Sequence, residues 1–132
     1  MSEAGPLLVR AEERRVAPAT AGMQREEAFG DEERWLGFVR TDPGVEGGWH
    51  HHGERDSYIY VLRGTIHIDF GPRGRDRITA HPGDFIFNPA RMIHREVTGS
   101  EPGELIVVRL GRGPHVVNVD GPDTDREASG QP

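Results

Sequence analysis

An all-β fold, either a sandwich or a barrel, is what this sequence of 132 residues predicts. About nine short segments rich in β-branched and aromatic residues follow one another at a spacing of roughly 8–12 residues. The 18 glycines and 10 prolines punctuate the chain into such segments and mark its turns. No stretch repeats its apolar residues with the period of a helix. The length indicates a single domain.

The expected strands begin near residue 20 and become clear from residue 35 onward. Residues 65–70 alternate between polar and apolar side chains, which predicts one buried face and one face in water. Residues 85–87 are continuously apolar, so we expect this strand to be covered on both faces. The other expected strands share β-branched or aromatic residues between turns: 20–29, 35–40, 49–52, 58–62, 77–80, 93–97, 105–110 and 115–119.

Three regions are expected along the chain. The barrel occupies residues 35–119. Residues 1–34 form an N-terminal segment, part of which is expected to be a β-strand that pairs with the barrel. Residues 120–132 are polar and contain glycine and proline, which predicts a disordered C-terminal tail.

The composition excludes several classes of protein. The net charge is −6, and every basic residue is an arginine scattered among acidic residues, which argues against a nucleic-acid surface. No apolar run approaches the roughly 20 residues of a membrane span, so no membrane partner is expected. The absence of cysteine excludes disulfides, thiolate metal sites and a cysteine nucleophile. We expect a cytoplasmic protein.

Three consecutive histidines, at positions 50–52, are the first candidate for chemistry. In an extended chain, residues two apart point to the same side, so His50 and His52 share a face and His51 points away. Two imidazoles on one face can converge on a single metal ion. A solvated turn is the alternative interpretation of this run taken alone.

Two longer stretches resemble the two signatures of the cupin superfamily. The first signature is a glycine, then His-x-His, a glutamate and a final glycine; here the stretch PGVEGGWHHHGERDSYIYVLRG runs to Gly64. The second signature places a glycine, a proline and a histidine at fixed spacing. In GDFIFNPARMIHREVT, these positions are Gly83, Pro89 and His94. The resemblance covers residues 35–118 and implies a double-stranded β-helix, also called a jelly-roll barrel.

The resemblance also implies a ligand set for one divalent metal ion, whether Fe, Zn, Ni, Mn or Cu. His50, His52 and His94 fall on three of the family's ligand positions. The fourth position, usually a glutamate, is Ser57 here. Two alternatives stay open: a site of three histidines alone, or one completed by Asp56 or Glu54.

The other positions that differ from the family's signatures, and the other histidines, are not expected to take part in the site. Arg91 stands where the family has glycine, and Thr98 where it has asparagine. Tyr58 and Tyr60 are expected to serve packing or an interface. The other histidines are expected to face away from the site or to lie near turns: His51, His67, His81 and His115.

Several functions are compatible with such a site. The first is a small, dioxygenase-like oxidoreductase, with an isomerase as a variant; the second is a non-catalytic module that binds a metal or a small molecule inside the barrel. A barrel that binds no metal in the cell is the third. Glu96, two residues after His94, is the candidate general acid or base, or else a partner that orients a histidine. The family also implies a homodimer.

Overall fold

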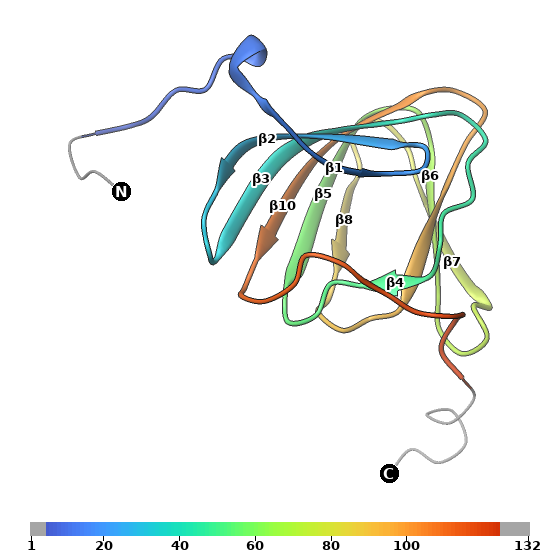
Figure 1. The fold of residues 1–132 in the computed structure, drawn as a ribbon. Helices are drawn as coiled ribbons and strands as arrows, with labels where there is room; N and C mark the ends of the chain where they lie inside the picture. Colours follow the sequence, from blue (N-terminus) through green and yellow to red (C-terminus); the bar gives the residue numbers. More distant parts are fainter. Residues whose placement is uncertain (1–4, 125–132) are drawn as a thin grey trace.

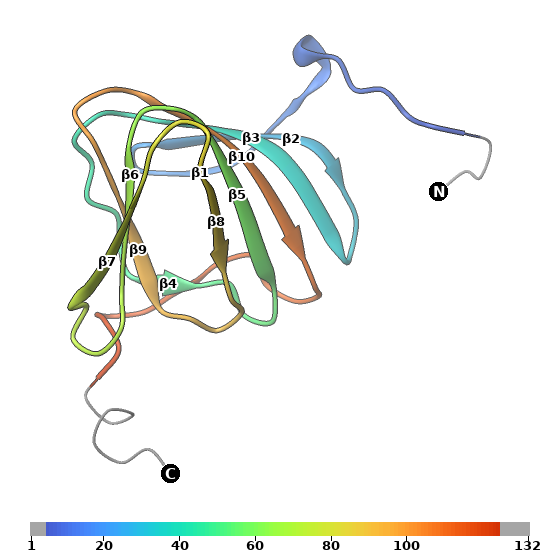
Figure 2. The ribbon, with the colours of Figure 1, turned by 180° about the vertical axis from the view of Figure 1, so that it is seen from behind.

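Two antiparallel β-sheets face one another in the computed structural model, which describes residues 5–124 (Figures 1 and 2). The six strands of the first sheet are, in spatial order, β1 (Arg15–Thr20), β2 (Met23–Gly30), β3 (Arg34–Thr41), β10 (Gly103–Leu110), β5 (Asp56–Arg63) and β8 (Phe85–Asn88). The five strands of the second sheet are β11 (Val117–Asn118), β4 (His50–His51), β9 (His94–Thr98), β6 (Ile66–Phe70) and β7 (Asp76–Ala80). The fold is therefore the expected all-β double-stranded β-helix.

The chain passes repeatedly between the two sheets, so strands far apart in sequence become neighbours. β10 lies between β3 and β5 and pairs with both. β6 lies between β7 and β9. Gly64, with φ +81°, turns the chain from β5 into β6, and a Cβ there would lie 2.7 Å from the Pro102 carbonyl oxygen. A glycine suits both the positive φ and the close approach.

The apolar core lies between the sheets and follows the alternation of the strands. Ile66 and Ile68 of β6 are fully buried, whereas His67 points outward, where its Nδ1 lies 2.8 Å from the Thr79 hydroxyl. The buried core residues are Trp35, Val39, Ile59, Val61, Ile66, Ile68, Ala80, Ile86, Leu105 and Val107.

The expectation for residues 85–87 is wrong in one respect. Phe85 and Phe87 are 80% and 51% exposed, and only Ile86 between them is buried. β8 is the last strand of its sheet, and its outer face is not covered by any other described element. The rings of Phe85 and Phe87 instead lie against Tyr60 and Tyr58 of β5, with ring centres 4.7 and 5.1 Å apart.

The segments that flank the barrel pair with it as far as the structure describes them. β2 pairs with β3, and β1 pairs with β2, after a single 3₁₀ turn at Ala11–Glu13. At the other end, the Arg73 amide donates to the Asp123 carbonyl at 2.7 Å, while residues 125–132 of the expected tail lie outside the described residues. Between residues 5 and 124, no helix is long and apolar enough to cross a membrane.

Asp69 on the outer side of β6 joins three strands. Its carboxylate accepts from Arg77 of β7 at 2.6 and 3.1 Å and from Arg95 of β9 at 3.0 Å. Hydrogen bonds from Arg77, joined by those from Arg95, hold the pKa of Asp69 below its ordinary value, although burial opposes them. These contacts connect three of the five strands of the second sheet.

Replacing Asp69 by asparagine should lower the free energy of unfolding by about 1–3 kcal/mol at neutral pH. Because the folded state depresses this pKa, the contribution is complete above the unfolded value of about 3.9 and is lost as the pH falls through the folded-state pKa. Urea titrations at neutral and acidic pH measure the difference. Asp120→Asn, at an exposed position, is the matched control; an equal loss in both variants, or one independent of pH, would contradict this account.

Candidate metal centre

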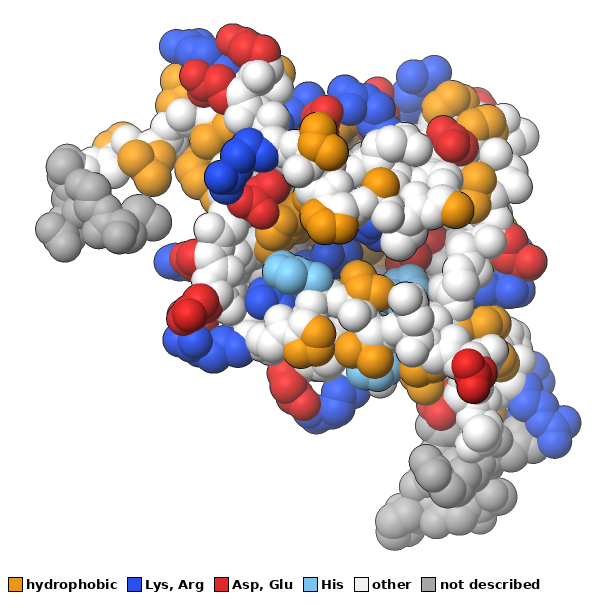
Figure 3. Space-filling model, in the orientation of Figure 1, with side chains coloured by type: hydrophobic (Ala, Val, Ile, Leu, Met, Phe, Trp, Pro, Cys, Tyr) orange, Lys and Arg blue, Asp and Glu red, His pale blue; other side chains and the backbone are white. Residues whose placement is uncertain are grey.

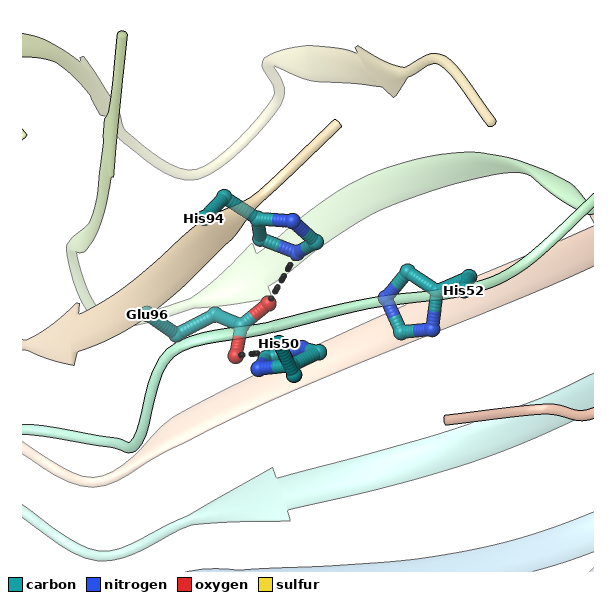
Figure 4. A group of neighbouring side chains, drawn as sticks. All are labelled: His50, His52, His94 and Glu96. Atoms are coloured by element: carbon teal, nitrogen blue, oxygen red, sulfur yellow. Dashed lines mark hydrogen bonds and ion pairs between the residues drawn. The ribbon is translucent and has the colours of Figure 1, made fainter. Parts of the chain in front are cut away.

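Two histidines from strands β4 and β9, and a third from just after β4, converge inside the barrel (Figure 4). His50 of β4 pairs directly with His94 of β9, and His52 follows two residues after His50 on the same side of the chain. The ring centres lie 4.5 Å apart for His50 and His94, 4.9 Å for His50 and His52, and 5.1 Å for His52 and His94. All three are buried, and His94 is 0% exposed.

A carboxylate completes the group. Glu96 lies two residues after His94 on β9 and therefore faces the same side. Its Oε2 lies 3.1 Å from the His94 Nε2, and its Oε1 lies 3.7 Å from the His50 Nε2 (Figure 4). One ligand atom from each of His50, His52, His94 and Glu96 lies within 4.8 Å of the others. The chain thus gathers three imidazoles and one carboxylate at one point.

Backbone carbonyls fix how the three rings are presented. The Nδ1 atoms of His50, His52 and His94 lie 2.9, 2.6 and 3.0 Å from the carbonyl oxygens of Gly48, His115 and Met92 respectively. A carbonyl oxygen only accepts, so each Nδ1 carries the proton and donates it. The Nε2 atom of each ring is left to face the cluster. Partners of this kind hold metal-binding histidines in place and set their tautomer.

The protonation states of the cluster follow from burial and from Glu96. Burial lowers the pKa of His50, and burial with the nearby Arg109 charge lowers the pKa of His52 to about 3. Burial also acts to lower the pKa of His94, but the hydrogen bond and charge of Glu96 outweigh it and raise that pKa. Burial acts to raise the pKa of Glu96, yet the bond to His94 and the imidazole charges hold it far below its ordinary range.

The donor set fits a divalent metal ion. Imidazole and carboxylate together suit zinc, iron and similar ions, whose distances to these ligands are near 2.1 Å. The ligand atoms of the cluster lie within 4.8 Å of one another, so small side-chain movements would bring each of them to that distance from one shared ion. The cluster could therefore hold a metal ion through the Nε2 atoms of His50, His52 and His94 and a carboxylate oxygen of Glu96.

The two acidic residues considered for the fourth position lie elsewhere. Asp56 accepts a hydrogen bond from the Ala90 amide at 2.8 Å, and Glu54 forms an exposed ion pair with Arg91. The carboxylate in the cluster is that of Glu96, which the sequence offered only as an acid, a base or an orienting partner. Its position two residues after a family histidine, on a predicted strand, was the signal for a shared face.

A hollow opens beside the cluster, and no sequence pattern predicted its shape. We call it the central hollow: three pockets of about 210, 20 and 440 Å³ that share Arg25 as a lining residue. His50 and Glu96 line the first two, and Arg109 lines the second and third. Figure 3 shows the hollow near the middle of the view, with basic and histidine side chains inside it. A small molecule could reach the cluster through it.

Comparison with known proteins decides the family. The model of the cupin domain matches residues 37–109, which is more than half of the chain and includes all four residues of the cluster. The protein belongs to the cupin family. No curated protein sequence matches this cupin.

Solved structures with the same fold come from several organisms. The polyketide cyclase RemF from Streptomyces resistomycificus is 23% identical over 97% of this chain and 95% of its own, with a TM-score of 0.70. KdgF from Halomonas sp. is 20% identical over 81% of this cupin and 96% of its own chain, with a TM-score of 0.68. The iron(II) form of HppE is 13% identical over 82% of this cupin and 62% of its own chain, with a TM-score of 0.72. At these identities the likeness shows the fold.

Proposed function

We propose that this cupin is a metal-dependent enzyme that acts on a small organic molecule, with His50, His52, His94 and Glu96 as the ligands of one divalent metal ion. The observation that carries the proposal is the buried cluster of four ligand side chains beside the central hollow. Four protein ligands would close a tetrahedral site, but an ion that takes five or six ligands, such as iron, would keep positions open towards the hollow. A four-ligand cluster beside a hollow supports catalysis on that basis.

The chain's own residues have distinct tasks in this proposal. A bound divalent ion would supply Lewis acidity or, if it is iron, a centre for oxygen chemistry. The carbonyls of Gly48, Met92 and His115 hold the three imidazoles in the tautomer that presents Nε2. Glu96 brings one negative charge that partly balances the ion. The burial of the three histidines strengthens their interactions with the charged Glu96.

We further propose oxidoreductase chemistry of the dioxygenase type, with iron as the metal. Three imidazoles and a carboxylate suit iron, and a cupin of the same fold, HppE, is described with iron(II). The cyclase RemF matches this chain over nearly its whole length and favours the second candidate, metal-assisted chemistry without a net redox change. A module that binds a metal or ligand without turnover is the non-catalytic alternative.

Metal analysis of protein purified without a histidine tag tests the first part of the proposal. We expect about one equivalent of one divalent metal per chain, removable by a chelator and restored by titration with a single metal salt. Protein that takes up no metal, even after reconstitution with Fe, Zn, Ni, Mn and Cu in turn, would contradict a metal-dependent function.

Oxygen uptake by the iron-loaded protein, with diketones, thiols and phenols as trial substrates, tests the second part. Uptake that depends on both iron and substrate supports the oxidoreductase. Ligand binding without any consumption of oxygen or substrate favours the non-catalytic module.

A homodimer and a cytoplasmic location stay predictions. The exposed rings of Phe85, Phe87 and Tyr58 on the outer face of β5 and β8 support the first, because a large exposed apolar patch is typical of an interface. The edge of β8 away from β5 has no partner strand among residues 5–124, and a second copy could pack on this face.

A further inference from the structure

A row of three polar side chains crosses the inner face of the first sheet at the level of the metal cluster. Arg109 of β10 pairs with Ser57 of β5, and Ser57 pairs with Asn88 of β8, so their side chains point to the same side. We call these three residues the polar row. Along β10 the inward positions are Leu105, Val107 and then Arg109, so the row begins where the apolar core ends.

The polar row carries hydrogen-bonding groups that the protein leaves unused. Ser57, Asn88 and Arg109 are 1%, 2% and 7% exposed, and the Ser57 Oγ, the Asn88 Nδ2 and the Arg109 Nε have no hydrogen-bond partner among the described residues. Asn88 Nδ2 and Arg109 Nε are donors, and a serine hydroxyl can donate as well. Leaving such groups unpaired inside a protein costs stability, so their presence calls for a partner from outside the chain.

All three residues of the polar row face the same small space as the metal cluster. Ser57, Asn88 and Arg109 line the 20 Å³ pocket together with His50, His52 and Glu96. A space of this size holds about one oxygen atom, such as one water molecule or the end of a carboxylate. The 440 Å³ pocket shares Arg25 and Arg109 with it as lining residues, and its wall also includes Ala17, Pro18 and Trp35.

The charge of this region favours an anion. Arg25 and Arg109 are both cationic, and Glu96 is the acidic residue in contact with the histidines. Burial and the neighbouring Arg25 charge lower the pKa of Arg109 to about 10, which still leaves it charged at neutral pH. Arg25 is weakly held, by contacts of 3.3 and 3.4 Å to Thr20 and Pro18. The Glu27 carboxylate already accepts hydrogen bonds from the Trp35 Nε1, at 2.8 Å, and from Arg15.

We propose that the central hollow binds a small organic carboxylate, one oxygen of which is held by Arg109, Ser57 and Asn88, with Arg25 at the entrance and the apolar body against Trp35. The part of this inference that makes the carboxylate a substrate rests on the proposed metal-dependent function. The binding itself depends only on the polar row and Arg25. It also gives a role to the serine at position 57, because a glutamate there would pair with Arg109 and neutralise it.

Calorimetric titration with benzoate, in chloride-free buffer, tests the inference on both metal-free and metal-loaded protein. We expect saturable binding to both forms and at least about tenfold weaker binding of the uncharged benzamide. Arg109→Gln should weaken benzoate binding by about tenfold or more, and Ser57→Ala by about threefold to tenfold. Arg63→Gln, which removes the same charge from the exposed end of β5, should bind benzoate as the wild type does.

The outcomes separate this inference from the proposed function. If acetate, oxalate and benzoate all fail to bind either form, or if Ser57→Ala and Arg25→Gln both bind like the wild type, the inference is overturned even where the protein holds a metal. The serine and Arg25 variants keep the test valid if Arg109→Gln does not fold. Arg109-dependent binding by a chain that takes up no metal would uphold the anion site and reject the metal-dependent enzyme.

Discussion

Replacing His94 by alanine is expected to weaken metal binding by about 100-fold or more, because the change removes the proposed ligand that lies closest to Glu96 and pairs with His50. Even the loss of a group that only orients a metal ligand typically costs 10–100-fold in affinity, and the loss of the ligand itself costs at least as much. His50→Ala and His52→Ala should have effects of the same order. Competition with a chromophoric chelator measures the affinities.

His51→Ala is the matched control for these variants. His51 is in the same run of histidines, but its Nδ1 accepts from the Gly53 amide at 3.0 Å, on the side away from the cluster. It should bind metal like the wild type. If His51→Ala lost the metal while His50→Ala kept it, the assignment of the ligands would be wrong. Circular dichroism of each metal-free variant distinguishes a lost ligand from a lost fold.

Changing Glu96 to glutamine should weaken metal binding by about 10–100-fold and also change its dependence on pH. Glu96 raises the pKa of His94, so in the metal-free protein this histidine holds a second proton at a higher pH than an ordinary histidine does. A metal ion must displace that proton from Nε2. The apparent affinity of the wild type should therefore fall as the pH drops through this raised pKa.

In the glutamine variant the charge that raises the pKa of His94 is gone. The loss of affinity should then begin at a lower pH, and metal binding near neutral pH should release fewer protons than in the wild type. Calorimetry in buffers of different ionisation enthalpy counts these protons. His50 and His52 do not disturb the measurement, since their pKa values are lowered. Equal proton release by both proteins would contradict the pairing of His94 with Glu96.

Local signals were sufficient to predict an all-β sandwich or barrel, and the resemblance to the cupin signatures implied the double-stranded β-helix. Alternation along Ile66–Phe70 and turn residues such as Gly64 each depend on a short stretch of chain. The exposure of Phe85 and Phe87 could not be read in this way. It depends on β8 being the last strand of its sheet, which only the complete topology determines.

For the site, too, local patterns predicted which residues share a face but not which of them are in contact. The alternation of a strand indicates that His94 and Glu96 share a face, but not that Glu96 reaches the three imidazoles. The bond between the His52 ring and the His115 carbonyl joins residues 63 positions apart, and no local pattern predicts it. Arg109 follows two buried apolar residues at inward positions of β10, but its place beside Ser57 and Asn88 depends on pairing between strands that no local pattern predicts.

The position of Glu96 has a consequence for how relatives of this cupin are recognised. A search that demands a glutamate at the position of Ser57 would class this chain as lacking an acidic ligand, although Glu96 on β9 supplies a carboxylate to the cluster and the count of candidate ligands is the same. A carboxylate on β9 leaves position 57 on β5 free for a small side chain that faces the cavity. A search for a small residue there, together with a glutamate two positions after the last histidine, should therefore find chains with the same cluster.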